Sequence, residues 1–102
     1  MARFDVYKYD NSSVPFVLDV QANLLSELST CAVIPMVSEK KAKQEALQKL
    51  KPTIAINGQN YILMTTDIGT VTRSSLGKKI ANIEDEYRQV VTEALDFLFQ
   101  GF

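Results

Sequence analysis

Residues 53–63 read TIAINGQNYIL, and this stretch decides the fold because it encodes a tight β-hairpin. Asn57 and Gly58 both tolerate a positive φ, which a two-residue type I′ turn requires at its two central positions. Such a turn places Ile54 opposite Tyr61. Alternation along the strands then divides the apolar side chains between two faces, namely Ile54, Ile56, Tyr61 and Leu63 against Ala55, Ile62 and Met64. Because both faces are largely apolar, we expect a central hairpin, with a core on one side and a helix or second subunit on the other.

Two segments upstream predict a second hairpin, and a third predicts another strand. Residues 4–7 and 16–20 alternate between two faces with the period of a half-buried strand, and the turn signal DNSS at 10–13 separates them. A further apolar run covers residues 31–37 and contains Pro35. Proline has no N–H to donate to a ladder, so we expect this strand at a sheet edge or with a bulge at that position.

Two further segments carry weaker signals. Residues 69–72 (GTVT) predict one more short strand. Residues 38–50 are rich in Lys, Glu, Ala and Gln, which favours a helix, but their apolar side chains form only a thin stripe, so a short helix and a loop both stay open. Lysines dominate residues 40–51 and acids dominate residues 84–96, a division that is typical of two solvated faces and that also suits a charged partner.

The last fifth of the sequence predicts one amphipathic helix over residues 83–99. Asn82 suits the N-cap, and three acidic residues follow in the first turn, where the helix dipole favours anions. One apolar stripe is expected in the core, formed by Ile83, Tyr87, Val90, Val91, Ala94, Phe97 and Leu98. Phe99 instead projects among polar residues, Gly101 is placed to end the helix, and Phe102 follows. An apolar chain end of this kind is more economical if it docks, and the rest of the domain, a sister subunit and a partner protein all stay open as the surface that receives it.

Composition bounds the functional classes. The 102 residues suit a single domain over 1–102, and the net charge of −1 gives no basic face for nucleic acid. The sequence has no histidine and one cysteine, Cys31, in an apolar run. We therefore expect no metal, no cofactor, no Ser-His-Asp site and no disulfide, and a buried thiol in a reducing compartment. With no membrane-spanning or signal segment in the sequence, the expected location is the cytoplasm. Asp67 with Arg73 is the one acid–base pair worth naming, and a turn role for Asp67 is favoured.

Six short motifs in the right order resemble the CcdB family of toxins nearly from end to end. The motifs are FDVYKY at 4–9, FVLDVQ at 16–21, AVIP at 32–35, LKPTI at 50–54, MTTD at 64–67 and FQGF at 99–102. The resemblance implies a mainly β fold, an antiparallel SH3-like barrel with a long C-terminal α-helix. It also implies a homodimer that binds the A subunit of DNA gyrase and traps the cleaved gyrase–DNA complex without being an enzyme.

The same resemblance implies a labile cognate antitoxin that wraps the dimer. The toxin–antitoxin complex would repress its own operon, so operator DNA is a partner only through that complex. By position, the gyrase-contacting residues are Leu24, Leu25, Asp96, Phe99, Gln100, Gly101 and Phe102. Asp96 stands in place of an amide, Gln100 in place of a tryptophan and Phe102 in place of an aliphatic residue. These departures bear on potency and target spectrum rather than on the fold.

Two alternatives stay open at this point. A ribonuclease toxin of the same barrel fold would need a basic groove and an acid–base pair, which a near-neutral chain without histidine does not readily supply. A non-toxic homologue that only binds antitoxin differs from a gyrase poison at the divergent C-terminal residues alone. Induction in cells lacking the antitoxin separates these readings.

Overall fold

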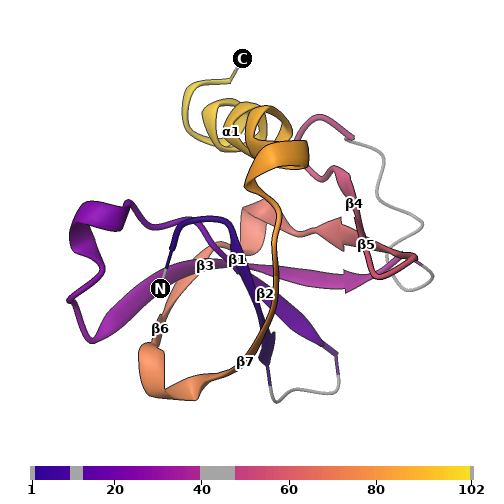
Figure 1. Cartoon of the computed structure of the whole chain (residues 1–102). Helices are drawn as coiled ribbons and strands as arrows, with labels where there is room; N and C mark the ends of the chain where they lie inside the picture. Colours follow the sequence, from indigo (N-terminus) through magenta and orange to yellow (C-terminus); the bar gives the residue numbers. More distant parts are fainter. Residues whose placement is uncertain (1, 10–12, 40–47, 102) are drawn as a thin grey trace.

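Seven strands form one antiparallel sheet among the residues that the structure, a computed structural model, describes, which are 2–9, 13–39 and 48–101. The sheet order is β4-β5-β3-β2-β1-β7, and β6 pairs with β3 (Figure 1). The strands are β1 (Asp5–Tyr9), β2 (Phe16–Asp19), β3 (Thr30–Ser38), β4 (Thr53–Ile56), β5 (Gln59–Leu63), β6 (Gly69–Thr72) and β7 (Leu76–Asn82). The sheet curls into a half-barrel, and the single helix α1 (Glu84–Gln100) packs at one end. The predicted mainly β fold with one C-terminal helix is confirmed.

Strand β3 is the centre of the sheet, so the expectation of an edge strand or bulge at Pro35 is wrong. Pro35 pairs with Val17 of β2 in an unbroken register. On the other side of β3, residues 36–38 pair with β5 and residues 30–33 pair with β6. N and O of one residue in an antiparallel strand face the same neighbour, and the Pro35 carbonyl accepts from Met64 N at 2.9 Å as the chain leaves β5. The missing N–H of Pro35 therefore lies at the point where β3 stops pairing with β5 and has not yet begun to pair with β6.

The Asn57-Gly58 hairpin forms as predicted, but at the end of the sheet rather than in its middle. Asn57 has φ 51° and Gly58 has φ 82°, and the strands pair in the predicted register. Strand β4 is an edge strand, and its outward residues Thr53 and Ala55 are exposed. Only one face of β4 is buried, so this hairpin gives no argument of its own for a second subunit.

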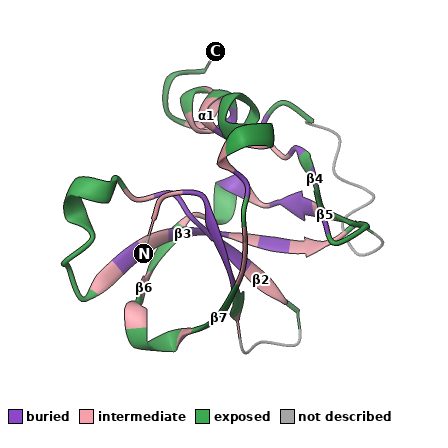
Figure 2. Ribbon diagram, viewed as in Figure 1, coloured by how far each residue is buried: buried purple, intermediate pink, exposed green. Residues whose placement is uncertain are grey.

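The buried apolar side chains form two clusters, and buried residues run along the central strands of the sheet (Figure 2). The larger cluster joins the sheet to α1 and consists of Phe4, Val6, Leu18, Val20, Ile34, Met36, Ile54, Ile56, Leu63, Ile83 and Val91. A smaller cluster on the other face holds Tyr7, Val17, Cys31 and Val33. Residues 4–7 are all buried, so the first strand is covered on both sides instead of half-buried. Cys31 is free and buried, as expected.

Helix α1 begins one residue later than predicted. Ile83 occupies the N-cap position, while the side-chain oxygen of Asn82 accepts from Glu84 N at 3.0 Å. Val91 and Ala94 are fully buried, but Val90 is 38% exposed, so its assignment to the core stripe is wrong. Leu95, outside the predicted stripe, packs against the core in its place.

Candidate interaction site

The end of α1 presents an aromatic side chain to solvent. Phe99 is 70% exposed, and the neighbouring Asp96, Gln100 and Gly101 are exposed as well. Gly101 closes the helix in the left-handed conformation at φ 84°, and its N–H donates to Phe97 O at 2.9 Å. We call Asp96, Phe99, Gln100 and Gly101 the helix tip. The prediction that Phe99 points away from the core is confirmed, and Phe102 lies outside the described residues.

The opposite side of α1 is held firmly, which fixes where the helix tip points. Val91 and Ala94 are buried against the domain. Tyr87 accepts a hydrogen bond on its hydroxyl from Ala55 N at 3.1 Å, which ties the helix to the edge strand β4. At the start of the helix, Asn82 also donates to Asp5 Oδ1 at 2.9 Å. The helix tip is therefore the end of a helix whose first three turns are fixed to the rest of the domain.

A buried charged network supports this anchor. Asp5 is 1% exposed and accepts hydrogen bonds from Ala2 N, the Tyr7 hydroxyl and Asn82, with Lys79 Nζ at 3.3 Å. Burial raises the pKa of the Asp5 carboxyl, but these donors outweigh burial, so its pKa lies below the usual value. The same burial and the Asp5 charge raise the pKa of Tyr7. The carboxylate is thus ionised and paired beside the start of α1.

Leu24 and Leu25 lie on a separate exposed loop between β2 and β3. Leu24 is 92% exposed and Leu25 is 44% exposed, and both belong to the short 3-10 turn Asn23–Leu25. All side chains of residues 22–29, the leucine loop, are exposed (Figure 2). Leu28, 49% exposed, adds a third apolar side chain that the sequence reasoning did not select, although three leucines in five residues were a usable signal.

The helix tip and the leucine loop form two separate projections of one chain. In Figure 1 the leucine loop extends at the left and the end of α1 lies at the top. The structure thus presents the described site residues at two exposed places without bringing them together. A single partner surface that meets both must be broad, or must meet copies of them from two subunits.

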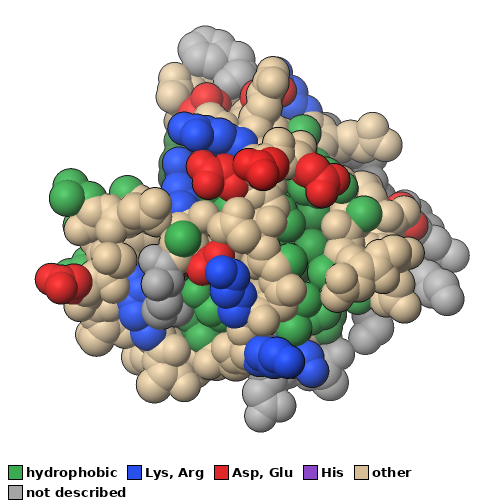
Figure 3. All heavy atoms as spheres, viewed as in Figure 1, with side chains coloured by type: hydrophobic (Ala, Val, Ile, Leu, Met, Phe, Trp, Pro, Cys, Tyr) green, Lys and Arg blue, Asp and Glu red, His purple; other side chains and the backbone are tan. Residues whose placement is uncertain are grey.

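Acidic side chains are concentrated at the start of α1. Glu84, Asp85 and Glu86 occupy its first turn, and acidic side chains gather over the helix in Figure 3. Arg88 offsets one of them through an ion pair with Glu84 at 3.2 Å. Such a surface repels phosphate groups, so it is not suited to bind nucleic acid directly.

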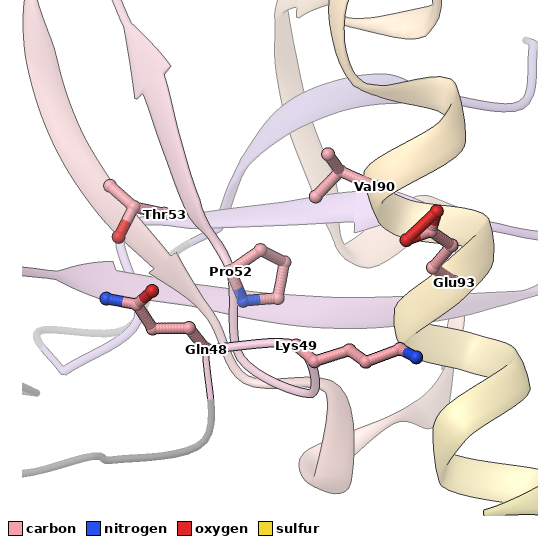
Figure 4. Close-up of a pocket in the computed structure, with 6 residues that line it drawn as sticks. All are labelled: Gln48, Lys49, Pro52, Thr53, Val90 and Glu93. Atoms are coloured by element: carbon pink, nitrogen blue, oxygen red, sulfur yellow. The ribbon is translucent and has the colours of Figure 1, made fainter. Parts of the chain in front are cut away.

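A groove of about 510 Å³ lies between α1 and the segment that leads into β4 (Figure 4). Val90 and Glu93 line it from the helix, and Gln48, Lys49, Pro52 and Thr53 line it from the other side. The Lys49 ammonium lies 5.7 Å from the centre of the Phe97 ring, within the range of a cation–π contact. Most of the basic segment 40–51 lies outside the described residues, but Lys49 places part of its charge beside this groove.

Asp67 and Arg73 have surroundings that do not suggest acid–base catalysis. Asp67 borders an apolar cleft of about 120 Å³, which is small compared with ordinary ligand sites. The Arg73 side chain donates from Nε to Leu28 O at 2.6 Å and from Nη2 to Leu25 O at 3.5 Å. Its guanidinium is therefore engaged by hydrogen bonds to the leucine loop.

A second buried acid lies near Arg73. Burial raises the pKa of Asp19, and burial together with the Asp19 charge raises the pKa of the Cys31 thiol to about 11. Within the described ranges, no three His, Cys, Asp or Glu side chains are placed to hold a metal ion. The same part of the chain has no helix long and apolar enough to cross a membrane.

Comparison with known proteins identifies a family and solved structures of similar fold. The family model described as CcdB protein matches residues 3–101. An endoribonuclease in complex with its cognate antitoxin, from a mycobacterial species, is 14% identical with a TM-score of 0.78, covering 97% of this chain and 94% of that one. Another mycobacterial endoribonuclease is 14% identical with a TM-score of 0.74, covering 97% and 90%. At this identity the two structures establish a shared fold.

Proposed function

The chain belongs to the CcdB family of toxins, and we propose that it is the toxin of a type II toxin–antitoxin module that poisons DNA gyrase. It would bind the A subunit and trap the complex in which gyrase has cleaved DNA. The proposal covers the whole chain as a single toxin domain that acts in the cytoplasm.

The observation that carries this proposal is the exposed Phe99 on an anchored helix. An aromatic side chain that is 70% exposed contributes little to its own domain, yet aromatic residues are among the commonest hot spots of protein interfaces. Because Val91 and Ala94 fix the helix, little freedom of the backbone is lost when Phe99 enters a partner's pocket. The helix tip suits a wedge that inserts into another protein.

We propose further that the toxin is a homodimer. Leu24, Leu25, Val90 and Phe99 are all exposed in the isolated chain, which favours association with other surfaces. A symmetric pair presents two helix tips at once, and a gyrase gate built from two A subunits offers two equivalent places for them. The dimer would thus hold the two helix tips in a fixed arrangement.

We propose that an acidic antitoxin, disordered before it binds, neutralises this toxin. The basic segment 40–51 offers an electrostatic site for it. Its described member Lys49 lines the groove beside α1 from the side of β4, so its charge would attract acidic side chains of the antitoxin to that side of the groove. Because α1 is acidic, operator DNA would be bound through the antitoxin in a complex that represses the operon.

A ribonuclease toxin is the second candidate, because two solved structures of similar fold are endoribonucleases. Against it, the chain has no histidine, and the Arg73 guanidinium is engaged by backbone carbonyls. We therefore expect no enzymatic activity, no metal and no cofactor. A non-toxic homologue that only binds antitoxin is the third candidate, since Asp96, Gln100 and Phe102 depart from the family pattern.

Induction of the gene in cells that lack the antitoxin tests the proposal. A gyrase poison causes DNA breaks and loss of viability, both of which disappear in a host whose gyrase A subunit is resistant. Killing with intact DNA and cleaved RNA would instead establish the ribonuclease. Normal growth, with stable protein that still binds antitoxin, would establish the non-toxic homologue.

A further inference from the structure

We propose that Arg73 is a positioning residue that holds the leucine loop, residues 22–29, in the conformation that docks on gyrase. This inference rests on the proposed function and extends it to a residue outside the contact surface. It also adds Leu28 to Leu24 and Leu25 as a third apolar contact.

Burial does little to fix the leucine loop. None of residues 22–29 is buried, and even Leu25 and Leu28 keep 44% and 49% of their surface exposed, so hydrophobic packing contributes little to the order of the loop. Within the loop, Leu25 N, Ser26 N and Leu28 N each donate to a carbonyl three residues earlier. Short local turns of this kind open easily, because their hydrogen bonds are exposed to solvent and few other contacts hold them. Anchors from outside the loop must therefore supply its order.

Arg73 supplies the anchor that is most distant in the sequence. It begins the 3-10 turn Arg73–Ser75 after β6, and its side chain reaches back to two loop carbonyls, Leu28 O at 2.6 Å and Leu25 O at 3.5 Å. Its own N–H donates to Ser29 O at 2.8 Å. A planar guanidinium with several donors can bridge two carbonyls at once, which a lysine ammonium does less well.

The Arg73 guanidinium also interacts electrostatically with a buried acid, Asp19. Burial raises the pKa of Asp19, and the positive charge of Arg73 partly offsets that rise, as it does for Cys31. The buried acid thus attracts the guanidinium towards the sheet. Because Asp19 belongs to β2, this attraction favours a position of Arg73 close to the strands that carry the core.

Gln21 is a second anchor at the same carbonyl. Its amide nitrogen donates to Leu25 O at 3.2 Å and to Thr30 O at 3.1 Å, and its oxygen accepts from Ala32 N at 3.2 Å. Leu25 O therefore receives donors from both Gln21 and Arg73. With the loop ordered in advance, the leucines dock without the entropic cost of ordering it.

The test compares Arg73→Met and Arg73→Lys with Arg88→Met, a control on the exposed face of α1. Affinity for the purified gyrase A subunit is measured with the full chain. We expect Arg73→Met to weaken binding by roughly tenfold, the value of a hydrogen bond to a charged group, and Arg73→Lys to weaken it less. Arg88→Met should bind like the parent. Equal affinity of Arg73→Met and the parent would overturn the inference.

Hydrogen exchange separates positioning from general destabilisation. In Arg73→Met the amides of Leu25, Ser26 and Leu28 should exchange faster, while Leu18 and Ile34 in the core keep their rates. Faster exchange throughout the core would mean that Arg73 stabilises the whole fold, and unchanged loop rates would mean that it does not hold the loop. Either result overturns the inference.

A double-mutant cycle with Leu24→Ala then asks whether Arg73 acts through the loop. Leu24 is 92% exposed, so its truncation removes a contact without disturbing the fold. If Arg73 positions the loop, the two losses of affinity combine to less than their sum, whereas additive losses would show that Arg73 contacts gyrase independently. A parent chain that fails to bind gyrase A at all would refute the proposed function, and loop exchange would then decide the role of Arg73 alone.

Discussion

Truncation of Phe99 to alanine should separate poisoning from folding. A fully buried phenylalanine costs about 3–5 kcal/mol when it is cut to alanine. Phe99 is 70% exposed, so only roughly a third of its side-chain surface is in contact with the domain. We therefore expect its truncation to lower the free energy of unfolding by about 1 kcal/mol. If Phe99 is a hot spot, affinity for the gyrase A subunit falls by at least about 2 kcal/mol, or about 30-fold.

Phe4→Ala is the matched control, because Phe4 is the same residue type at 1% exposure. Phe4 has φ 75°, and alanine meets the same backbone cost at that position, so the comparison isolates the loss of the side chain. Urea unfolding should show a loss of about 3–5 kcal/mol for Phe4→Ala. The gyrase affinity of each variant is measured at temperatures where it remains folded.

Two further changes probe the same tip. Deletion of residues 100–102 should abolish killing while antitoxin binding and thermal stability stay nearly unchanged. Gly101→Glu should also abolish killing, but at a cost of about 1 kcal/mol or more, since Gly101 lies at φ 84° and an acid opposes the dipole at the end of a helix. Variants that still kill, or a Phe99→Ala protein that unfolds like Phe4→Ala, would refute the reasoning.

The remaining predictions concern assembly, the antitoxin and two buried groups. Sedimentation at micromolar concentration should give a dimer, and a monomer would count against the paired-tip arrangement. Neutralising Lys40, Lys41 and Lys43 should speed antitoxin release at low salt without unfolding the toxin; unchanged release kinetics exclude this contact. Native Cys31 should react with iodoacetamide at pH 8 far more slowly than a free thiol, because the thiol is buried and burial raises its pKa to about 11; labelling at the free-thiol rate contradicts its buried placement. Asp5 has a lowered pKa when folded, so its contribution to stability is present above pH 3.8 and is lost as the pH falls through the folded value; urea unfolding of Asp5→Asn should lose that acid dependence.

Local rules predicted the elements whose signals lie within a few residues. The Asn57-Gly58 turn demands positive φ at two positions, so it specified its hairpin and register. The 3.6-residue period likewise specified α1 and the outward direction of Phe99. The resemblance to a known family then supplied the site residues that periodicity alone does not name.

Features that depend on distant segments were missed or misplaced. A proline within a strand predicts an edge or a bulge because it has no N–H to donate to the ladder, whereas the Pro35 nitrogen lies at the point where β3 exchanges β5 for β6. Strand β7 has a glycine and two lysines that interrupt its alternation, and its pairing with β1 shifts register, so no local pattern marked it. The role of Arg73 depends on carbonyls 45 and 48 residues away, which no spacing rule connects.

The most direct test of the central claim is the amount of linear DNA released by purified gyrase in the presence of this chain. Gyrase, supercoiled plasmid, ATP and the toxin are incubated, and the reaction is stopped with detergent and protease. The proposed function predicts linear DNA that increases with toxin concentration and disappears when antitoxin is added or Phe99 is replaced by alanine. Plasmid that stays uncleaved at toxin concentrations saturating the A subunit would contradict the claim that this protein poisons gyrase.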